Sequence, residues 1–201
     1  MKELTRYCRV AGYLDKIFDL LNKEFFESAL SKPTITIQST PKAYGHFSLS
    51  ENTWVSKLGG THEINIGAGT LARPIEEVVA TLLHEMVHYY NYTNGVQDCS
   101  RGNTYHNKMF KQEAEKRGLY VSYSKSYGWS HTEPGDRLLK FVLDNDLTEI
   151  LLNRNEIRGS SVKKGTSSTK KYICPCCRMS IRATRVVKIK CMDCDAQMVR
   201  V

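Results

Sequence analysis

The sequence predicts an α+β domain followed by a small β module that a metal ion holds together. Long segments repeat apolar residues every three to four positions, as amphipathic helices do, and shorter segments alternate like strands. Four of the seven cysteines form two CxxC pairs near the C-terminus. The 201 residues suffice for one domain and a small appendage.

The first elements in the chain are one helix and several short strands. Apolar residues at helical spacing predict a helix within residues 4–30 with one buried face. β-branched residues then alternate over 33–39, and further candidate strands follow at 43–49 and 63–66. Two glycines at 59–60 indicate a break between strands. We expect a small antiparallel sheet.

Three more helices follow this sheet. Pro74 and two glutamates favour the start of a long helix that ends before Gly95, and its continuous apolar stripe places it against the core. Another helix is expected over 107–116 and a further one over 137–152.

The C-terminal part begins with a solvated linker. Residues 159–171 are mostly Gly, Ser, Thr and Lys and show no apolar period. We therefore expect a first domain over 1–158 and a small module over 172–201.

Charge is distributed unequally between these parts. Residues 1–160 contain 19 Lys and Arg and 19 Asp and Glu, whereas residues 161–201 contain 10 and 2. The excess of positive charge in the C-terminal part favours binding to nucleic-acid phosphates. Because the tail has one aromatic residue, Tyr172, we expect mainly electrostatic binding with weak sequence selectivity. The expected contacts are Lys170, Lys171, Arg182, Arg185, Lys188 and Lys190.

The composition also constrains localisation. Hydrophobic residues make up 41% and charged residues 25%, which excludes a largely disordered chain. No apolar run approaches the roughly 20 residues of a membrane helix, and the N-terminus lacks the apolar segment of a secretory signal. We expect an intracellular, cytoplasmic protein with no membrane partner, associated with the nucleoid if its source is bacterial.

The central helix contains the motif HEMVH: His84, Glu85 and His88. Histidines four residues apart project from one helix face and can bind one zinc ion, while the glutamate approaches the water that zinc activates. This arrangement suits hydrolysis, with Glu85 as the general base. A catalytic zinc site normally takes three protein ligands.

The third ligand has several candidates. His106 lies in a polar loop after the helix, and Glu113 or Glu115 would instead give a site of two histidines and one glutamate. Metzincin spacing is excluded because asparagines occupy positions 91 and 94. Surface or strand positions explain the three remaining histidines, which are His46, His62 and His131.

The four paired cysteines predict a second zinc site. Cys174, Cys177, Cys191 and Cys194 form CxxC-x13-CxxC, which is typical of a structural site with no open position. Cys176 is an additional candidate in the first pair. We expect a zinc ribbon in which residues 180–190 form a hairpin and zinc supplies most of the folding free energy.

Several of these segments together resemble a known family. The runs LARPIEEVVATLLHEMVHYYN, GNTYHNKMFKQEAEKRGL, YICPCC and IKCMDC are similar to those of the SprT-like proteins, which include the DNA-dependent protease Spartan. The resemblance implies a zincin-like metalloprotease domain and a third ligand in an HxxxF segment, which matches His106 and Phe110. Family members commonly have Gly after that histidine, where this chain has Asn107.

The sequence therefore favours a zinc metalloendopeptidase with one catalytic and one structural zinc ion. Its protein substrates are expected to be associated with DNA or crosslinked to it. Two alternatives remain at this point: a noncatalytic nucleic-acid-binding protein with two structural zinc sites, and a hydrolase of another bond. The oligomeric state is not predicted.

Overall fold

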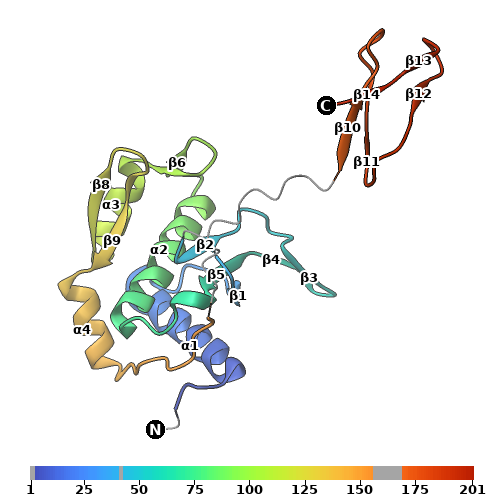
Figure 1. Cartoon of the computed structure of the whole chain (residues 1–201). Helices are drawn as coiled ribbons and strands as arrows, with labels where there is room; N and C mark the ends of the chain where they lie inside the picture. Colours follow the sequence, from blue (N-terminus) through green and yellow to red (C-terminus); the bar gives the residue numbers. More distant parts are fainter. Residues whose placement is uncertain (1–2, 41–42, 156–168) are drawn as a thin grey trace. The chain divides into compact units, whose positions relative to one another are not determined.

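The computed structural model describes residues 3–40, 43–155 and 169–201 (Figure 1). The chain divides into two compact units, Met1–Glu156 and Ile157–Val201. The predicted linker, residues 159–171, lies mostly outside the described residues, and its last two residues begin a strand.

Helix α1 (Tyr7–Phe26) confirms the predicted amphipathic opening helix. Its buried face includes Leu14, Phe18 and Leu21, which are fully enclosed in the core. Burying each such side chain contributes about 1.5–3 kcal/mol relative to exposure. The helix lies within the predicted range of 4–30 and ends at Phe26, because Glu27 adopts the left-handed conformation, with φ 54°.

The first sheet is mixed, so the prediction of an antiparallel sheet was wrong. Its strands β1 (Thr34–Gln38), β2 (Gly45–Phe47) and β5 (Glu63–Gly67) have the order β1-β5-β2. β1 pairs parallel with β5, and β2 pairs antiparallel with β5. The parallel pairing is possible because a long connection carries the chain back to the start of the sheet before β5.

The predicted break at Gly59-Gly60 was also wrong, because these residues belong to a hairpin. β3 (Trp54–Ser56) pairs antiparallel with β4 (Gly59–Thr61). Gly59 has φ +123°, which other residues rarely adopt, and a side chain at Gly60 would collide with the backbone of Glu51. The glycines are therefore needed to form the hairpin.

Helix α2 (Ile75–Thr93) is the central element of the first unit. It contacts the other three helices, strands β2 and β5 of the first sheet, and strand β9 of a second sheet. Its apolar residues are almost all buried, as the continuous stripe in the sequence predicted. Pro74 precedes it and Gly95, with φ +68°, follows its end.

The second sheet was not predicted. It consists of β6 (Cys99–Ser100), β7 (Tyr105–His106), β8 (Leu119–Ser124) and β9 (Gly128–Pro134), in the order β6-β7-β9-β8. β7 pairs parallel with β9 at a single position, whereas the other neighbours are antiparallel.

Helices α3 (Lys108–Lys116) and α4 (Asp136–Asp144) complete the first unit. α3 matches its prediction. α4 ends eight residues before the predicted end at 152, because Asp146 has φ 48° and the amide of Leu147 turns back to the carbonyl of Val142. None of the described helices is long and apolar enough to cross a membrane.

The second unit is a small β module. β10 (Lys170–Ile173) pairs antiparallel with β11 (Ser180–Ala183) and β14 (Val199–Arg200), and β12 (Lys190–Cys191) pairs with β13 (Ala196–Gln197). The prediction of a hairpin within 180–190 was wrong, because the partner of β11 is β10. The module starts two residues before the predicted position 172.

Candidate active site

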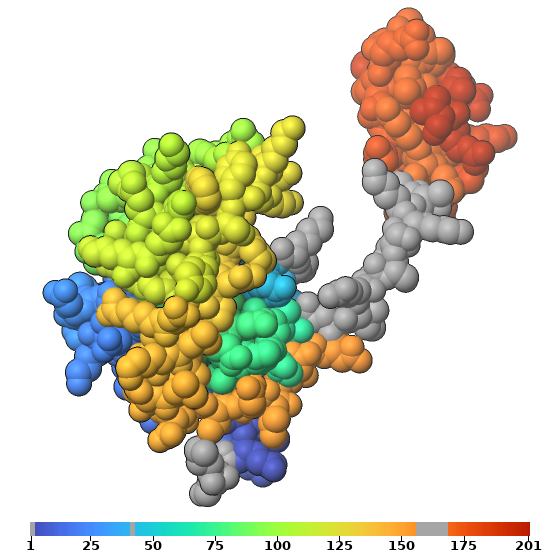
Figure 2. All heavy atoms as spheres, turned by 90° about the vertical axis from the view of Figure 1, so that its left-hand side faces the viewer, coloured from blue at the N-terminus to red at the C-terminus, as the bar shows by residue number. Residues whose placement is uncertain are grey.

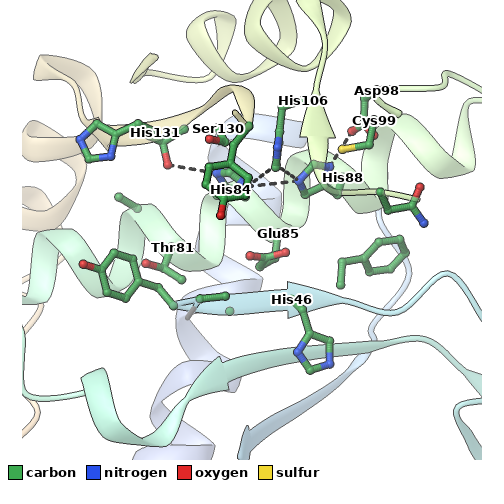
Figure 3. A pocket seen from close by; sticks show the side chains of 18 of the residues that line it. His46, Thr81, His84, Glu85, His88, Asp98, Cys99, His106, Ser130 and His131 are labelled. Carbon is green, nitrogen blue, oxygen red and sulfur yellow. Dashed lines mark hydrogen bonds and ion pairs between the residues drawn. The ribbon is translucent and has the colours of Figure 1, made fainter. Parts of the chain in front are cut away.

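Helix α2 presents His84, Glu85 and His88 of the HEMVH motif toward a cleft (Figure 3). His84 and His88 lie one turn apart on one helix face, so their rings stand side by side with centres 4.9 Å apart. Glu85, between them in sequence, lies on the side of the helix that faces β2.

The structure brings His106 to these two histidines. The Nε2 atom of His106 lies 3.2 Å from that of His84 and 3.0 Å from that of His88. The Nε2 atoms of His84 and His88 are 3.1 Å apart. The three nitrogen atoms thus form a nearly equilateral triangle.

This triangle has the size that a tetrahedral zinc ion requires. Zn–N bonds of about 2.0–2.1 Å at tetrahedral angles place two ligand nitrogens about 3.3 Å apart. Three neutral imidazole nitrogens that all face one point bring three lone pairs together, and a cation at that point makes the arrangement favourable. The three histidines therefore fit zinc and leave a fourth position open.

Two further residues orient the histidines. The Nδ1 atom of His88 lies 2.7 Å from a carboxylate oxygen of Asp98, and Nδ1 of His84 lies 3.0 Å from the hydroxyl of Thr132. A carboxylate can only accept, so Nδ1 of His88 donates and its Nε2 is free for a metal. Neither Asp98 nor Thr132 was predicted, because neither belongs to a local motif.

The surroundings keep His84 and His106 neutral. Burial, together with the neighbouring histidines, lowers the pKa of His84 well below its usual value. Burial likewise lowers the pKa of His106 to about 4. Neutral imidazole is the form that binds zinc.

His106 is positioned by a hydrogen bond to the start of β9 and by the helix cap that follows it. Its backbone amide donates to the carbonyl of Tyr127, which fixes β7 against the start of β9. Asn107 caps α3, and its side-chain oxygen accepts from the amides of Met109 and Phe110. The backbone at Asn107 is extended, with φ −94°, so this position does not require glycine.

Phe110 forms the floor of the histidine cluster. Its ring centre lies 4.6 Å from that of His84, 4.5 Å from that of His88 and 4.7 Å from that of His106. The side chain is fully buried. It therefore shields one side of the cluster from water.

Glu85 is buried between α2 and β2. The pKa of its carboxylate is raised to about 7 by burial, although His88 and a hydrogen bond from the Phe47 backbone partly oppose the shift. Strand β2 approaches closely because Gly45 has no side chain: a Cβ there would lie 3.1 Å from the Glu85 carboxylate.

The cleft has a volume of about 1180 Å³. Strand β2, helix α2 and strand β9 contribute to its walls, and His84, Glu85, His88 and His106 lie in its lining. β2 is an edge strand among the described residues, since it pairs with β5 alone.

The structure does not bring the other candidate ligands to this cluster. Glu113 pairs with the buried Arg117, and Glu115 lies near Lys111. His62 is buried against Phe47 instead of lying at the surface. His46 and His131 line the cleft but do not belong to the metal-binding clusters found among the described residues.

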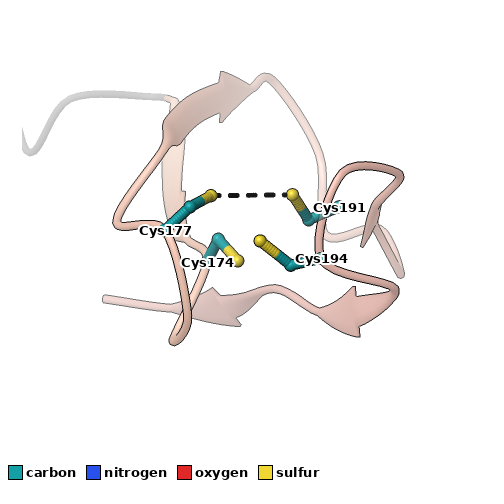
Figure 4. Close-up of side chains that lie close together, drawn as sticks. All are labelled: Cys174, Cys177, Cys191 and Cys194. Atoms are coloured by element: carbon teal, nitrogen blue, oxygen red, sulfur yellow. Dashed lines mark hydrogen bonds between the residues drawn. The ribbon is translucent and has the colours of Figure 1, made fainter.

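The second unit contains a cluster of four cysteines (Figure 4). The sulfur atoms of Cys174, Cys177, Cys191 and Cys194 all lie within 4.8 Å of one another, and those of Cys177 and Cys191 are 3.7 Å apart. Zn–S bonds of about 2.3 Å at tetrahedral angles require about 3.8 Å. The cluster fits zinc, and Cys176 is exposed and outside it.

The predicted cations lie on the surface of this unit. Arg182, Arg185, Lys188, Lys190 and Lys170 are exposed or partly exposed, and Lys171 is partly buried. Lys190 pairs with Asp195, at 2.5 Å.

Comparison with known families decides the classification. Residues 14–125, more than half of the chain, match the SprT-like family. The chain belongs to the SprT-like family. The matched residues of this SprT-like chain include HEMVH and His106, and the four-cysteine unit lies outside them. A search of curated proteins gives no match. Membership is consistent with a metallopeptidase-like first unit whose histidine cluster binds zinc.

Proposed function

We propose that this SprT-like protein is a zinc-dependent endopeptidase with a zincin-like catalytic unit. The observation that carries the proposal is the combination of three converging histidines with Glu85 in one cleft. His84, His88 and His106 would hold the catalytic zinc ion. When bound, zinc would supply a Lewis acid that polarises a carbonyl and lowers the pKa of water toward neutrality.

The residues of the chain perform the remaining tasks. Glu85 accepts a proton from the attacking water and donates it to the nitrogen of the leaving amine. Asp98 keeps His88 in the tautomer that leaves Nε2 free, and the hydroxyl of Thr132 can accept from Nδ1 of His84 in the same tautomer. Phe110 excludes water from one side of the cluster.

The open edge of β2 favours a polypeptide as substrate. An extended peptide can add to an exposed sheet edge through main-chain hydrogen bonds. Gly45 and Phe47 of β2 line the cleft next to Glu85. A peptide paired with β2 would pass the carboxylate with its backbone, so cleavage would depend little on one side chain.

The basic second unit supports proteins bound or crosslinked to DNA as the substrates. Its exposed cations would bind phosphates without reading sequence. The four-cysteine site would be structural, because it has no open position. The second unit would thereby bring the cleft close to proteins on the same nucleic acid.

The test compares wild type with Glu85→Gln in the cleavage of an unfolded DNA-binding protein, with and without single-stranded DNA. Because the general base is lost while the ligands remain, the rate should fall roughly 10²- to 10⁴-fold with zinc content unchanged. Glu24→Gln, at an exposed carboxylate on α1, is the matched control and should cleave like wild type. Activity of Glu85→Gln near that of wild type would refute the mechanism.

A further inference from the structure

A row of aromatic and cationic side chains lies on the second sheet and α3. The guanidinium of Arg101 lies 4.5 Å from the ring centre of Tyr105, and the hydroxyls of Tyr105 and Tyr123 are 3.2 Å apart. The ring centres of Tyr123 and Trp129 are 5.1 Å apart, and the ammonium of Lys111 lies 4.1 Å from that of Trp129. We call these five residues the aromatic–cation surface.

Core packing does not account for these rings. Tyr123 is 54% exposed, and Tyr105 and Trp129 are only partly buried. None of the three belongs to the hydrophobic core of the described residues, and none lies in the cleft lining. Figure 2 shows α3 and the β8–β9 hairpin, in green-yellow to yellow, as one continuous face of the first unit.

The charge of this region is positive although the first unit as a whole is neutral. Residues 99–134, which include the second sheet and α3, contain six Lys and Arg and three Glu, whereas the rest of residues 1–160 contain 13 basic and 16 acidic residues. All three glutamates have partners within the region: Glu113 pairs with Arg117, Glu115 lies 3.6 Å from Lys111, and Glu133 lies 3.3 Å from His131. The negative charge within the region is therefore matched locally, and the remaining cations give it a positive excess.

We propose that the aromatic–cation surface binds single-stranded nucleic acid. Bases of any sequence can stack on exposed tyrosine and tryptophan rings, and the neighbouring cations can contact the phosphates. A duplex keeps its bases stacked inside and cannot use the rings in this way. The combination of rings at stacking distance with local positive charge therefore favours a single strand over a duplex.

The surface shares two strands with the histidine cluster. β7 contributes Tyr105 to the surface and His106 to the cluster, and β9 contributes Trp129 to the surface and Thr132, whose hydroxyl contacts His84 of the cluster. A bound strand would hold an attached protein beside the cleft. This consequence rests on the proposed function, but the binding itself does not require hydrolysis.

The first experiment measures binding of a fluorescent oligo(dT) of roughly 15 nucleotides by anisotropy. The protein is the full chain with four cations of the second unit reversed, so that the first unit dominates binding: Arg182→Glu, Arg185→Glu, Lys188→Glu and Lys190→Glu. In this background, Tyr123→Ala or Trp129→Ala should weaken binding about 5- to 150-fold, the effect of one lost base–aromatic stack. Circular dichroism and zinc content check that the variants fold.

Three controls separate base stacking from effects of charge, hydrogen bonding or misfolding. Tyr123→Phe keeps the ring and should bind like its parent. Tyr120→Ala removes an equally exposed tyrosine, 55% exposed, from the same strand and should also leave binding unchanged. An abasic oligomer of the same length should bind Tyr123→Ala and its parent alike, because it has no bases to stack.

A second readout observes the surface directly. The chain has two tryptophans, so Trp54→Phe leaves Trp129 as the single indole fluorophore. Titration with oligo(dT) should quench its emission.

Unquenched emission at saturation, or unchanged oligo(dT) affinity in folded Tyr123→Ala and Trp129→Ala, would overturn the proposal. The proposal would also be overturned if Tyr123→Ala or Trp129→Ala weakened the binding of an unfolded protein but left oligo(dT) affinity unchanged. The surface would then be a protein-docking site. Loss of oligo(dT) binding with intact peptidase activity would support the proposal and leave the proposed function standing.

Discussion

At the scale of single residues, Asp98 contacts the histidine cluster from outside it through His88. Its carboxylate accepts from Nδ1 of His88 and from the side-chain amide of Asn91. Burial alone would raise the pKa of Asp98, but these hydrogen bonds and the electrostatic interaction with His88 hold it below its usual value. A charged partner at Nδ1 increases the electron density that the imidazole offers at Nε2.

Asp98→Asn should therefore weaken zinc binding at the histidine cluster. The amide keeps an acceptor for His88 but removes the charge, so we expect an affinity roughly 10- to 100-fold lower. Competition with a chromophoric chelator measures this. Asp144→Asn, at an exposed carboxylate paired with Lys140, is the control. Equal zinc affinity in both variants would show that Asp98 does not tune the site.

The third ligand can be tested by zinc stoichiometry. Wild type should bind two zinc ions per chain, and His106→Ala should bind one, because two remaining histidines make a weak site. Glu115→Ala, which removes an exposed carboxylate from the neighbouring helix, should retain two. Loss of an ion from Glu115→Ala but not from His106→Ala would make the proposed ligand set wrong.

Some residues of the candidate active site could be predicted from the sequence, and others could not. HEMVH was recognisable because helix geometry alone places positions four apart on one face. His106 could not be separated from Glu113 and Glu115 by spacing, since its approach depends on the pairing of β7 with β9. Asp98 and Thr132 reach the cluster through tertiary structure, 10 and 48 residues from their partners.

At the scale of elements, periodicity predicted the long helices and missed the second sheet. α1 and α2 contain enough turns for the apolar stripe to be unambiguous. In β8 the alternation is interrupted by a bulge between Ser122 and Ser124, and β6 and β7 have two residues each. Such strands carry too little pattern to be recognised, and the parallel pairing of β1 with β5 is likewise set by tertiary contacts.

Gly128 determines how β9 meets β7. It has φ +69°, and a Cβ there would collide with the carbonyl of His106 and lie 2.9 Å from the Tyr105 ring. Gly128→Ala should therefore destabilise the first unit by about 1–3 kcal/mol or more and weaken zinc binding by displacing His106.

Thermal denaturation with zinc analysis measures both effects of Gly128→Ala. Gly12→Ala is the matched control: Gly12 lies in α1 with nothing within 4 Å of its added Cβ. Alanine there should stabilise the helix by about 0.5–1 kcal/mol. If Gly128→Ala were as stable as wild type, the close approach of β9 to β7 would not restrict the residue at position 128.

At the scale of the whole molecule, the two units would contribute different kinds of affinity for nucleic acid. The second unit offers exposed cations and one buried tyrosine, so its binding would be electrostatic. The first unit offers exposed rings beside a few cations, so its binding would depend on unpaired bases. A single strand carrying a protein could engage both, whereas an intact duplex would engage only the second unit.

Charge reversal in the second unit tests its electrostatic contribution separately. Reversing Arg182, Arg185, Lys188 and Lys190 to Glu should weaken binding to duplexes of different sequence about equally, because phosphate contacts carry no sequence information. Each phosphate contact contributes about 0.7–0.9 to the slope of log affinity against log salt, so four lost contacts should flatten that slope by roughly 3.

Deletion of the second unit extends the same test. The remaining first unit should stay folded, keep one zinc ion and lose most of its duplex affinity, since the excised residues contain the entire positive excess. It should retain binding to oligo(dT) that Tyr123→Ala weakens, because stacking needs no long-range charge. Anisotropy across a salt series measures both probes. If the first unit bound duplex as tightly as the full chain, the cations of the second unit would not be phosphate contacts, and that unit would serve protein docking or stability instead.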